Sequence, residues 1–155
     1  MNRAVFLSLA IVGRAWYNSI ESLGGECMSE KSLTKEQAGA VSAASLAYLG
    51  DAVLEVLVRS RIVTAGENRP SEASLAYVTA ASQSDAAERI LPHLTEGEEA
   101  QYRRGRNCVH ANVPKKATVA QYRRATGFEA LFGYLHLIGE EDRIRELFAA
   151  AYPET

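Results

Sequence analysis

Apolar residues recur along most of this 155-residue chain at spacings of three and four, which is the period of an amphipathic α-helix. No stretch alternates between apolar and polar residues with a sustained period of two, so the pattern does not indicate strands. Between Ala52 and Val63 the apolar side chains fall close to one helical face: Val53, Leu54, Leu57, Val58 and Ile62. The pattern therefore predicts an all-α fold of roughly six to seven helices.

Capping residues mark several helix ends. Three segments have a threonine followed three positions later by glutamate or glutamine, the spacing of a capping box: Thr34–Gln37, Thr95–Glu98 and Thr118–Gln121. We expect the first helix to continue to Tyr48 and to break at Gly50, with Asp51 at the start of the next helix. Gly66 and Gly139 follow apolar runs and are expected to end helices.

Proline, serine and breaks in periodicity predict the remaining boundaries. A helical stretch is expected from Pro70 to Ala81, and Ser84 is expected to cap the next helix, which ends near Pro92. The segment Asn107–Ala117 contains a proline and lacks periodicity, which predicts a loop. A last helix is predicted over Glu140–Ala151.

The first thirty or so residues differ from the rest of the chain. The apolar run Ala4–Gly13 is too short to span a bilayer as a helix, and a signal-peptide core is the alternative, although no small-x-small cleavage site follows it cleanly. Met28 opens a stretch typical of a natural start. We therefore predict that residues 1–33 are an extension in which Met1–Cys27 is dispensable, and that residues 34–155 form one domain.

Charge is distributed unevenly along the chain. The net charge is −2, yet Gln101–Arg124 holds seven cations and no acid, so the remaining residues carry −2 − 7 = −9. A localised basic strip on an acidic body favours an anion-binding surface, and a solvated helix end and loop is the alternative. The two cysteines, Cys27 and Cys108, lie in no metal-ligand spacing, which favours a reducing compartment such as the cytoplasm.

Two carboxylates lie in unusually apolar surroundings, Asp51 in LAYLGDAVLE and Glu129 in GFEALFGYLHLIG. A carboxylate is costly there unless it is paired, hydrogen-bonded or bound to metal. If the two converge between core helices, they supply the oxygen ligands that Mg²⁺ prefers. The structural alternatives are an N-cap for Asp51 and an ion pair with Arg123 or Arg124 for Glu129.

These two segments also carry a family resemblance. LAYLGDAVLE resembles the metal-binding signature of the ribonuclease III family, and FEALFGYLHL resembles its second motif. The block RRGRNCVHANVPKKATVAQYRRATGFEALFGYL is similar to that of one branch, Mini-ribonuclease III, which has the catalytic domain without the double-stranded-RNA-binding domain. The resemblance covers roughly Ala38–Tyr152, most of the chain.

The resemblance implies a homodimeric, Mg²⁺-dependent endoribonuclease, with Mn²⁺ as a substitute metal, that cleaves double-stranded RNA without involving a membrane. Asp51 and Glu129 match the catalytic metal ligands, and the apolar run Ala43–Val58 serves either the core alone or both core and dimer interface. Glu55 and Thr126 are expected to lie behind the metal ligands and to assist them indirectly. The expected RNA-binding residues are Arg104, Arg106, Asn107, Lys115, Lys116 and Arg123. Precursors of large-subunit (23S) ribosomal RNA are the implied substrate, with a ribosomal protein as a helper.

The sequence also departs from the broader family. Ala44, Ala47 and Thr126 stand where other ribonuclease III members have carboxylates. This reduced set is compatible with a catalytically silent RNA-binding module, although retention of Asp51 and Glu129 favours the enzyme. An all-α hydrolase of small phosphate esters is disfavoured because the histidines have no metal-ligand spacing: His93, His110 and His136.

Overall fold

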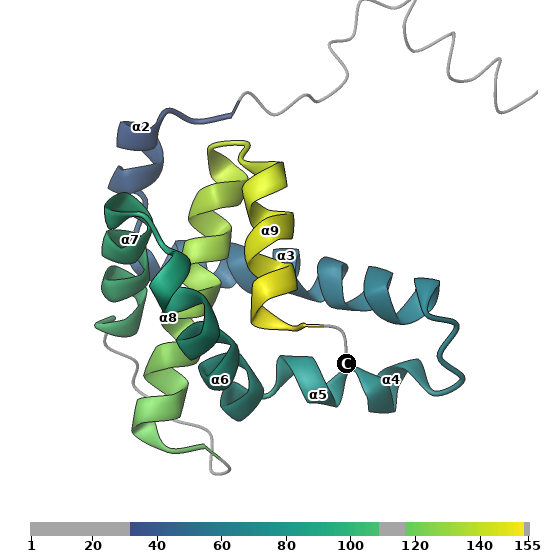
Figure 1. Ribbon diagram of the computed structural model, residues 1–155. Helices are drawn as coiled ribbons and strands as arrows, with labels where there is room; N and C mark the ends of the chain where they lie inside the picture. Colours follow the sequence, from purple (N-terminus) through teal and green to yellow (C-terminus); the bar gives the residue numbers. More distant parts are fainter. Residues whose placement is uncertain (1–31, 109–116, 154–155) are drawn as a thin grey trace, which may run out of the picture. The chain divides into compact units, whose positions relative to one another are not determined.

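The computed structural model describes residues 32–108 and 117–153, and over these residues every regular element is a helix (Figure 1). The all-α prediction is therefore confirmed. Within the described ranges no helix has the length and apolar content needed to cross a bilayer. The elements are α2 (Lys35–Ala40), α3 (Ala43–Thr64), α4 (Pro70–Ala73), α5 (Leu75–Val78), α6 (Ala80–Ile90), a 3-10 turn (Leu91–His93), α7 (Glu96–Arg106), α8 (Val119–Leu137) and α9 (Glu141–Ala151).

Helix α8 forms the centre of the core. It packs against α3, α6 and α7, and α9 lies beside it (Figure 1). Phe128, Leu131 and Phe132 are fully buried, and neighbouring residues on other sides of the same helix are also buried. A helix that is apolar on most sides must be surrounded by other elements. This explains why the most apolar segment of the sequence lies at the centre, and it places Glu129 there as well.

The crossing of α3 and α8 depends on two glycines. A Cβ atom at Gly50 would collide with the backbone carbonyl of Glu129, and one at Gly133 would collide with that of Leu46. The prediction of a break at Gly50 was wrong, because α3 is continuous from Ala43 to Thr64. Glycine weakens a helix by about 1 kcal/mol relative to alanine. Here the missing side chain lets two helix backbones touch, and the packing they gain offsets that cost.

Other helix starts also differ from the sequence prediction. The first helix ends at Ala40, and Ser42 caps α3 by accepting a hydrogen bond from the Ser45 amide at 3.1 Å. In α6 the cap is Thr79 and not Ser84. Ser84 is fully buried, and its hydroxyl accepts a hydrogen bond from Arg124 Nε at 2.7 Å. Serine signals a helix start only weakly, because the same hydroxyl can serve a tertiary contact.

The remaining end signals behave as predicted. All three capping boxes form, with their threonines directly before α2, α7 and α8. Gly66 and Gly139 have φ angles of 70° and 76°, the left-handed conformation that ends a helix. The stretch predicted from Pro70 to Ala81 is helical but divided into α4, α5 and the first turn of α6. Most of the loop predicted over Asn107–Ala117 lies outside the described residues.

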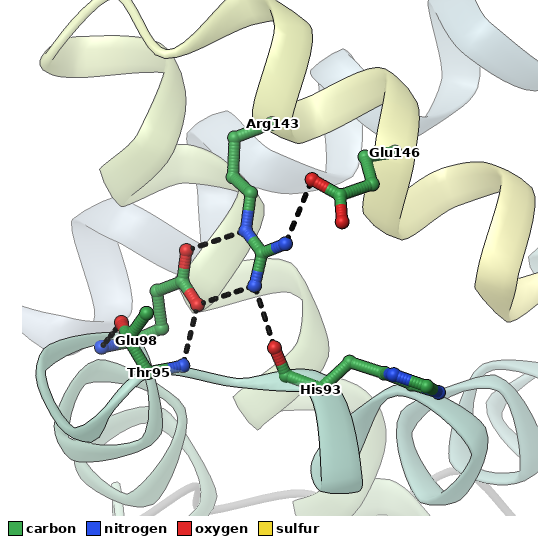
Figure 2. Close-up of polar contacts among 5 residues, drawn as sticks. All are labelled: His93, Thr95, Glu98, Arg143 and Glu146. Atoms are coloured by element: carbon green, nitrogen blue, oxygen red, sulfur yellow. Dashed lines mark hydrogen bonds and ion pairs between the residues drawn. The ribbon is translucent and has the colours of Figure 1, made fainter.

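The start of α9 is tied to α7 by a polar cluster (Figure 2). Arg143 donates to both carboxylate oxygens of Glu98 at 2.8 and 2.9 Å and to the His93 carbonyl at 2.6 Å. It also forms an ion pair with Glu146 at 2.8 Å. Burial raises the pKa of Glu98, but hydrogen bonds from Arg143 and Thr95 outweigh it and lower that pKa below its usual value. A bidentate, mostly buried pair of this kind gives α9 a defined position.

Two other arginines hold the end of α9. Arg61 of α3 donates to the Tyr152 carbonyl at 2.6 Å, and Arg89 of α6 donates to the Ala151 carbonyl at 2.9 Å. They satisfy carbonyl groups that a helix C-terminus otherwise leaves without partners. The Tyr152 hydroxyl donates to the Tyr77 carbonyl at 3.1 Å, which fixes the ring beside α5. The C-terminal end of α9 thus becomes part of the wall around the site described next.

Candidate active site

The α3–α8 crossing brings Asp51 and Glu129 together. Asp51 follows Gly50, whose backbone touches the backbone of Glu129. The two carboxylates are close enough for the charge of Asp51 to affect the pKa of Glu129. Asp51 lies inside α3, and Ser42 provides the N-cap of that helix. The alternative interpretation of Asp51 as an N-cap was therefore wrong.

Glu129 is an acid for which the described residues offer no cationic partner. Among the described residues it forms no ion pair, and Arg124 instead contacts Glu88 at 3.2 Å and Ser84 at 2.7 Å. Burial, followed by the charge of Asp51, raises the pKa of Glu129 to about 8, although a hydrogen bond from the Gln83 side chain opposes the shift. The alternative of an ion pair with Arg123 or Arg124 was therefore wrong. A buried carboxylate facing another one is a setting that a bound cation would stabilise.

A small pocket opens beside these acids. Its volume of about 90 Å³ corresponds to the liquid volume of roughly three water molecules. Side chains from α3, α5, α6 and the end of α9 line it: Asp51, Leu54, Glu55, Val58, Tyr77, Val78, Gln83 and Tyr152. Glu129 is linked to this pocket through the charge of Asp51 and the hydrogen bond of Gln83. The pocket thus combines two acidic side chains of α3 with apolar and aromatic ones.

Glu55 is the second carboxylate that lines the pocket, beside Asp51. It lies one turn after Asp51 and forms an ion pair with Arg59 on the exposed side of α3. Burial, and then the charge of Glu55, raises the pKa of Asp51. In the described ranges no three His, Cys, Asp or Glu side chains are arranged to hold a metal ion by themselves. Asp51 and Glu129 fit Mg²⁺ nevertheless, since that ion usually binds one or two carboxylates and keeps several waters.

Comparison with known proteins identifies the family. A family model described as Ribonuclease III domain matches residues 44–140, which include both carboxylates. The chain belongs to the ribonuclease III family. The mini-ribonuclease 3 of Symbiobacterium thermophilum is 44% identical over 110 residues, covering 69% of this chain and 85% of that protein. The mini-ribonuclease 3 of a Thermoanaerobacter species is 40% identical over 131 residues, covering 82% of this chain and 92% of that protein.

A solved structure agrees with this assignment. The crystal structure of a Fusobacterium nucleatum protein is 30% identical to the chain, with a TM-score of 0.65 over 70% of this chain and 89% of that one. The chain is thus a mini-ribonuclease III by sequence and has a ribonuclease III fold. Family membership confirms the prediction of an endoribonuclease.

The remaining predicted site residues of this mini-ribonuclease III lie elsewhere or outside the described residues. Thr126 is buried, and its hydroxyl donates to the Tyr122 carbonyl at 3.0 Å rather than lining the pocket. Arg104 is half-buried and donates to the Val41 carbonyl at 2.8 Å, so it holds the junction between α2 and α3. The predicted RNA-binding residues that are exposed are Arg106, Asn107 and Arg123, and those outside the described residues are Lys115 and Lys116.

Sequence reasoning did not identify several pocket residues of this mini-ribonuclease III. Tyr77 and Tyr152 face the pocket only because α5 and the end of α9 meet there. Gln83 had a detectable signal, since it is a polar residue three and four positions before the buried Ala86 and Ala87. A polar side chain on a buried helical face needs a partner, but the sequence does not show which one.

Proposed function

We propose that this mini-ribonuclease III is a Mg²⁺-dependent endonuclease that hydrolyses double-stranded RNA, with Asp51 and Glu129 as its catalytic metal ligands. The observation that carries the proposal is the convergence of these acids at the α3–α8 crossing, where burial, followed by the charge of Asp51, raises the pKa of Glu129 to about 8. Two like charges side by side, one of them largely shielded from solvent and with no basic partner among the described residues, are unfavourable for folding alone. A cation-dependent function accounts for this arrangement.

The chain's own residues perform the binding and orienting steps. When bound, Mg²⁺, or Mn²⁺ in its place, supplies Lewis-acid chemistry by activating a water and polarising a phosphoryl oxygen. Asp51 and Glu129 would hold the ion, and Glu129 would release its proton on binding because only the carboxylate is a ligand. No serine, cysteine, lysine or histidine is among the residues lining the described pocket, which supports water rather than a side chain as the nucleophile.

Glu55 and the basic residues have supporting parts in this proposal. Glu55 lines the pocket beside Asp51 and could orient a water there. Arg106, Asn107 and Arg123 are exposed and suited to phosphate contacts. The sequence pattern favours the same role for Arg104, Lys115 and Lys116. Duplex RNA would be bound through shape and backbone charge, which makes the affinity sensitive to salt.

We also propose that the enzyme acts as a homodimer. One site cuts one strand, so cleavage of both strands calls for two sites related by a two-fold axis. Along α3, Tyr48, Val56 and Val63 are 85, 65 and 72% exposed, on a helix that also carries Asp51. Tyr48 and Val56 lie within Ala43–Val58 and are not core residues, which supports an additional use of this run in an interface. A second copy packed on this face would cover them and bring two pockets together.

The biological setting is likewise a proposal. From the resemblance to Mini-ribonuclease III we propose that the chain matures large-subunit (23S) ribosomal RNA precursors in the cytoplasm, with a ribosomal protein as a helper. Residues 34–155 would be the catalytic domain and residues 1–33 an extension of it. Leu33 donates its amide to the Leu137 carbonyl at 2.7 Å, so a chain beginning at Met28 keeps this contact and should remain fully active.

A cleavage assay tests the main proposal against the silent RNA-binding module. Labelled duplex RNA is incubated with the protein in Mg²⁺, in Mn²⁺ and in EDTA, and binding is followed in parallel by electrophoretic mobility shift. We expect cleavage with either metal, no cleavage in EDTA, and retained binding in EDTA. Binding without cleavage under every metal condition would instead establish the silent module.

A further inference from the structure

The Gln83 side chain is polar and buried, and it does not belong to the hydrophobic core cluster. Its side chain is 5% exposed, and it lies on the face of α6 that packs against α8. An amide left without a partner in such a place is unfavourable. The other buried polar side chains of the described residues bond elsewhere: Ser84 with Arg124, Glu98 with Arg143 and Thr95, and Thr126 with Tyr122.

The partner of Gln83 is one of the two acids of the candidate site. The Gln83 side chain lies close enough to the Glu129 carboxylate to lower its pKa, and the same side chain lines the pocket with Asp51. Helix α6 therefore contributes one group to a site whose acids come from α3 and α8. The amide is the only nitrogen-bearing side chain among the residues that line this described pocket.

We infer that Gln83 is a positioning residue whose amide holds the Glu129 carboxylate in the orientation that lets it share one divalent cation with Asp51. The inference rests on the proposed metal-dependent function. A carboxylate that gives an oxygen to a cation still needs a donor for its remaining lone pairs when it is buried. Groups in this position fix the orientation of metal ligands, and their loss typically costs about 10- to 100-fold in metal affinity.

The test replaces Gln83 by methionine, which is similar in length but has no amide. Binding of Mn²⁺ alone is measured by isothermal titration calorimetry, and cleavage is measured over a range of Mg²⁺ concentrations. We expect the Mn²⁺ dissociation constant and the half-saturating Mg²⁺ concentration to rise about tenfold or more. The KM for RNA should stay unchanged because a side chain that is 5% exposed presents almost no surface to RNA.

Ser84→Ala is the matched control. It removes a buried hydroxyl from the same helix, but that hydroxyl contacts Arg124 and not Glu129. Thermal unfolding should show a lower stability for this variant, while its Mn²⁺ affinity should equal that of the wild type. An equal loss of Mn²⁺ affinity in both variants would assign the effect to α6 packing and overturn the positioning role.

A second measurement uses the wild-type protein and does not require a variant to fold. In ¹⁵N-labelled protein, the side-chain amide resonances of Gln83 should move on addition of Mg²⁺, while those of Gln121, in the α8 capping box, should not. Resonances of Gln83 that stay fixed while Mg²⁺ binds would refute the inference and leave the proposed function standing. If the wild type binds neither Mg²⁺ nor Mn²⁺, the proposed function fails and the inference fails with it.

Discussion

At the residue scale, turnover should depend on Asp51 and Glu129. We expect Asp51→Asn and Glu129→Gln each to reduce turnover by at least about 100-fold, since each removes a ligand charge. Single-turnover cleavage of duplex RNA measures this, with circular dichroism to verify the fold.

The proximity of these two acids could be predicted from the sequence, because carboxylates in apolar surroundings need a partner such as a shared cation. Gln83 and the aromatic wall could not be predicted, because their contribution depends on how α5, α6 and α9 pack.

Glu55→Gln is the control for those two variants. It removes a carboxylate from the same pocket but leaves both proposed ligands in place, so its effect on turnover should be much smaller. Wild-type rates in Asp51→Asn would refute the assignment of Asp51, and wild-type rates in Glu129→Gln would do the same for Glu129. A loss in Glu55→Gln as large as theirs would show that the site needs three carboxylates.

The pKa of Glu129 also predicts how stability depends on pH. Because that pKa is raised to about 8, the metal-free folded state keeps a proton that the unfolded chain releases near pH 4.5. The free energy of unfolding of the wild type should therefore fall as the pH rises from about 4.5 to 8. Glu129→Gln cannot ionise at this position, so its stability should not show this fall. Urea unfolding in EDTA at pH 7 should show the variant to be more stable by about 1–3 kcal/mol. Equal pH dependence of stability in both proteins would show that the pKa of Glu129 is not raised in the folded state.

At the element scale, helix type and most helix ends followed from periodicity and capping, while the Gly50 and Ser84 predictions failed. Both failures have one cause, since each residue is used by a tertiary contact that local propensity does not include. The α3–α8 crossing therefore gives a sharp test. Gly133→Ala should destabilise the protein by roughly 1–3 kcal/mol and lower turnover, because the added methyl group forces the Leu46 carbonyl, and α3 with it, away from α8.

Gly97→Ala is the matched control for the crossing. Gly97 lies in α7, and a Cβ atom there would meet nothing within 4 Å. This substitution should leave turnover unchanged and raise stability by up to about 1 kcal/mol through helix propensity alone. Urea unfolding and cleavage rates check both variants. If Gly133→Ala behaves like Gly97→Ala, close backbone contact is not what positions the two acids.

At the scale of the whole molecule, the exposed apolar face of α3 is the feature that a single chain does not explain. Its sequence pattern was compatible with both a core and an interface. The observed exposure of Tyr48, Val56 and Val63 shows that these side chains are not part of the core. Val56→Glu should therefore convert a dimer into a monomer, because it places two charges in a two-fold apolar contact. Sedimentation velocity measures the assembly state, and cleavage of a doubly labelled duplex reports paired cuts.

Val119→Glu is the control for this substitution, because Val119 is 53% exposed but lies at the start of α8. It should leave assembly and cleavage unchanged, whereas Val56→Glu should lose paired cuts while its circular dichroism stays that of the wild type. A wild type that sediments as a monomer at micromolar concentration would contradict the dimer without touching the metal proposal. Since Asp51 and Val56 share one helix, loss of the dimer with retained Mn²⁺ binding would separate the assembly role of α3 from its catalytic role.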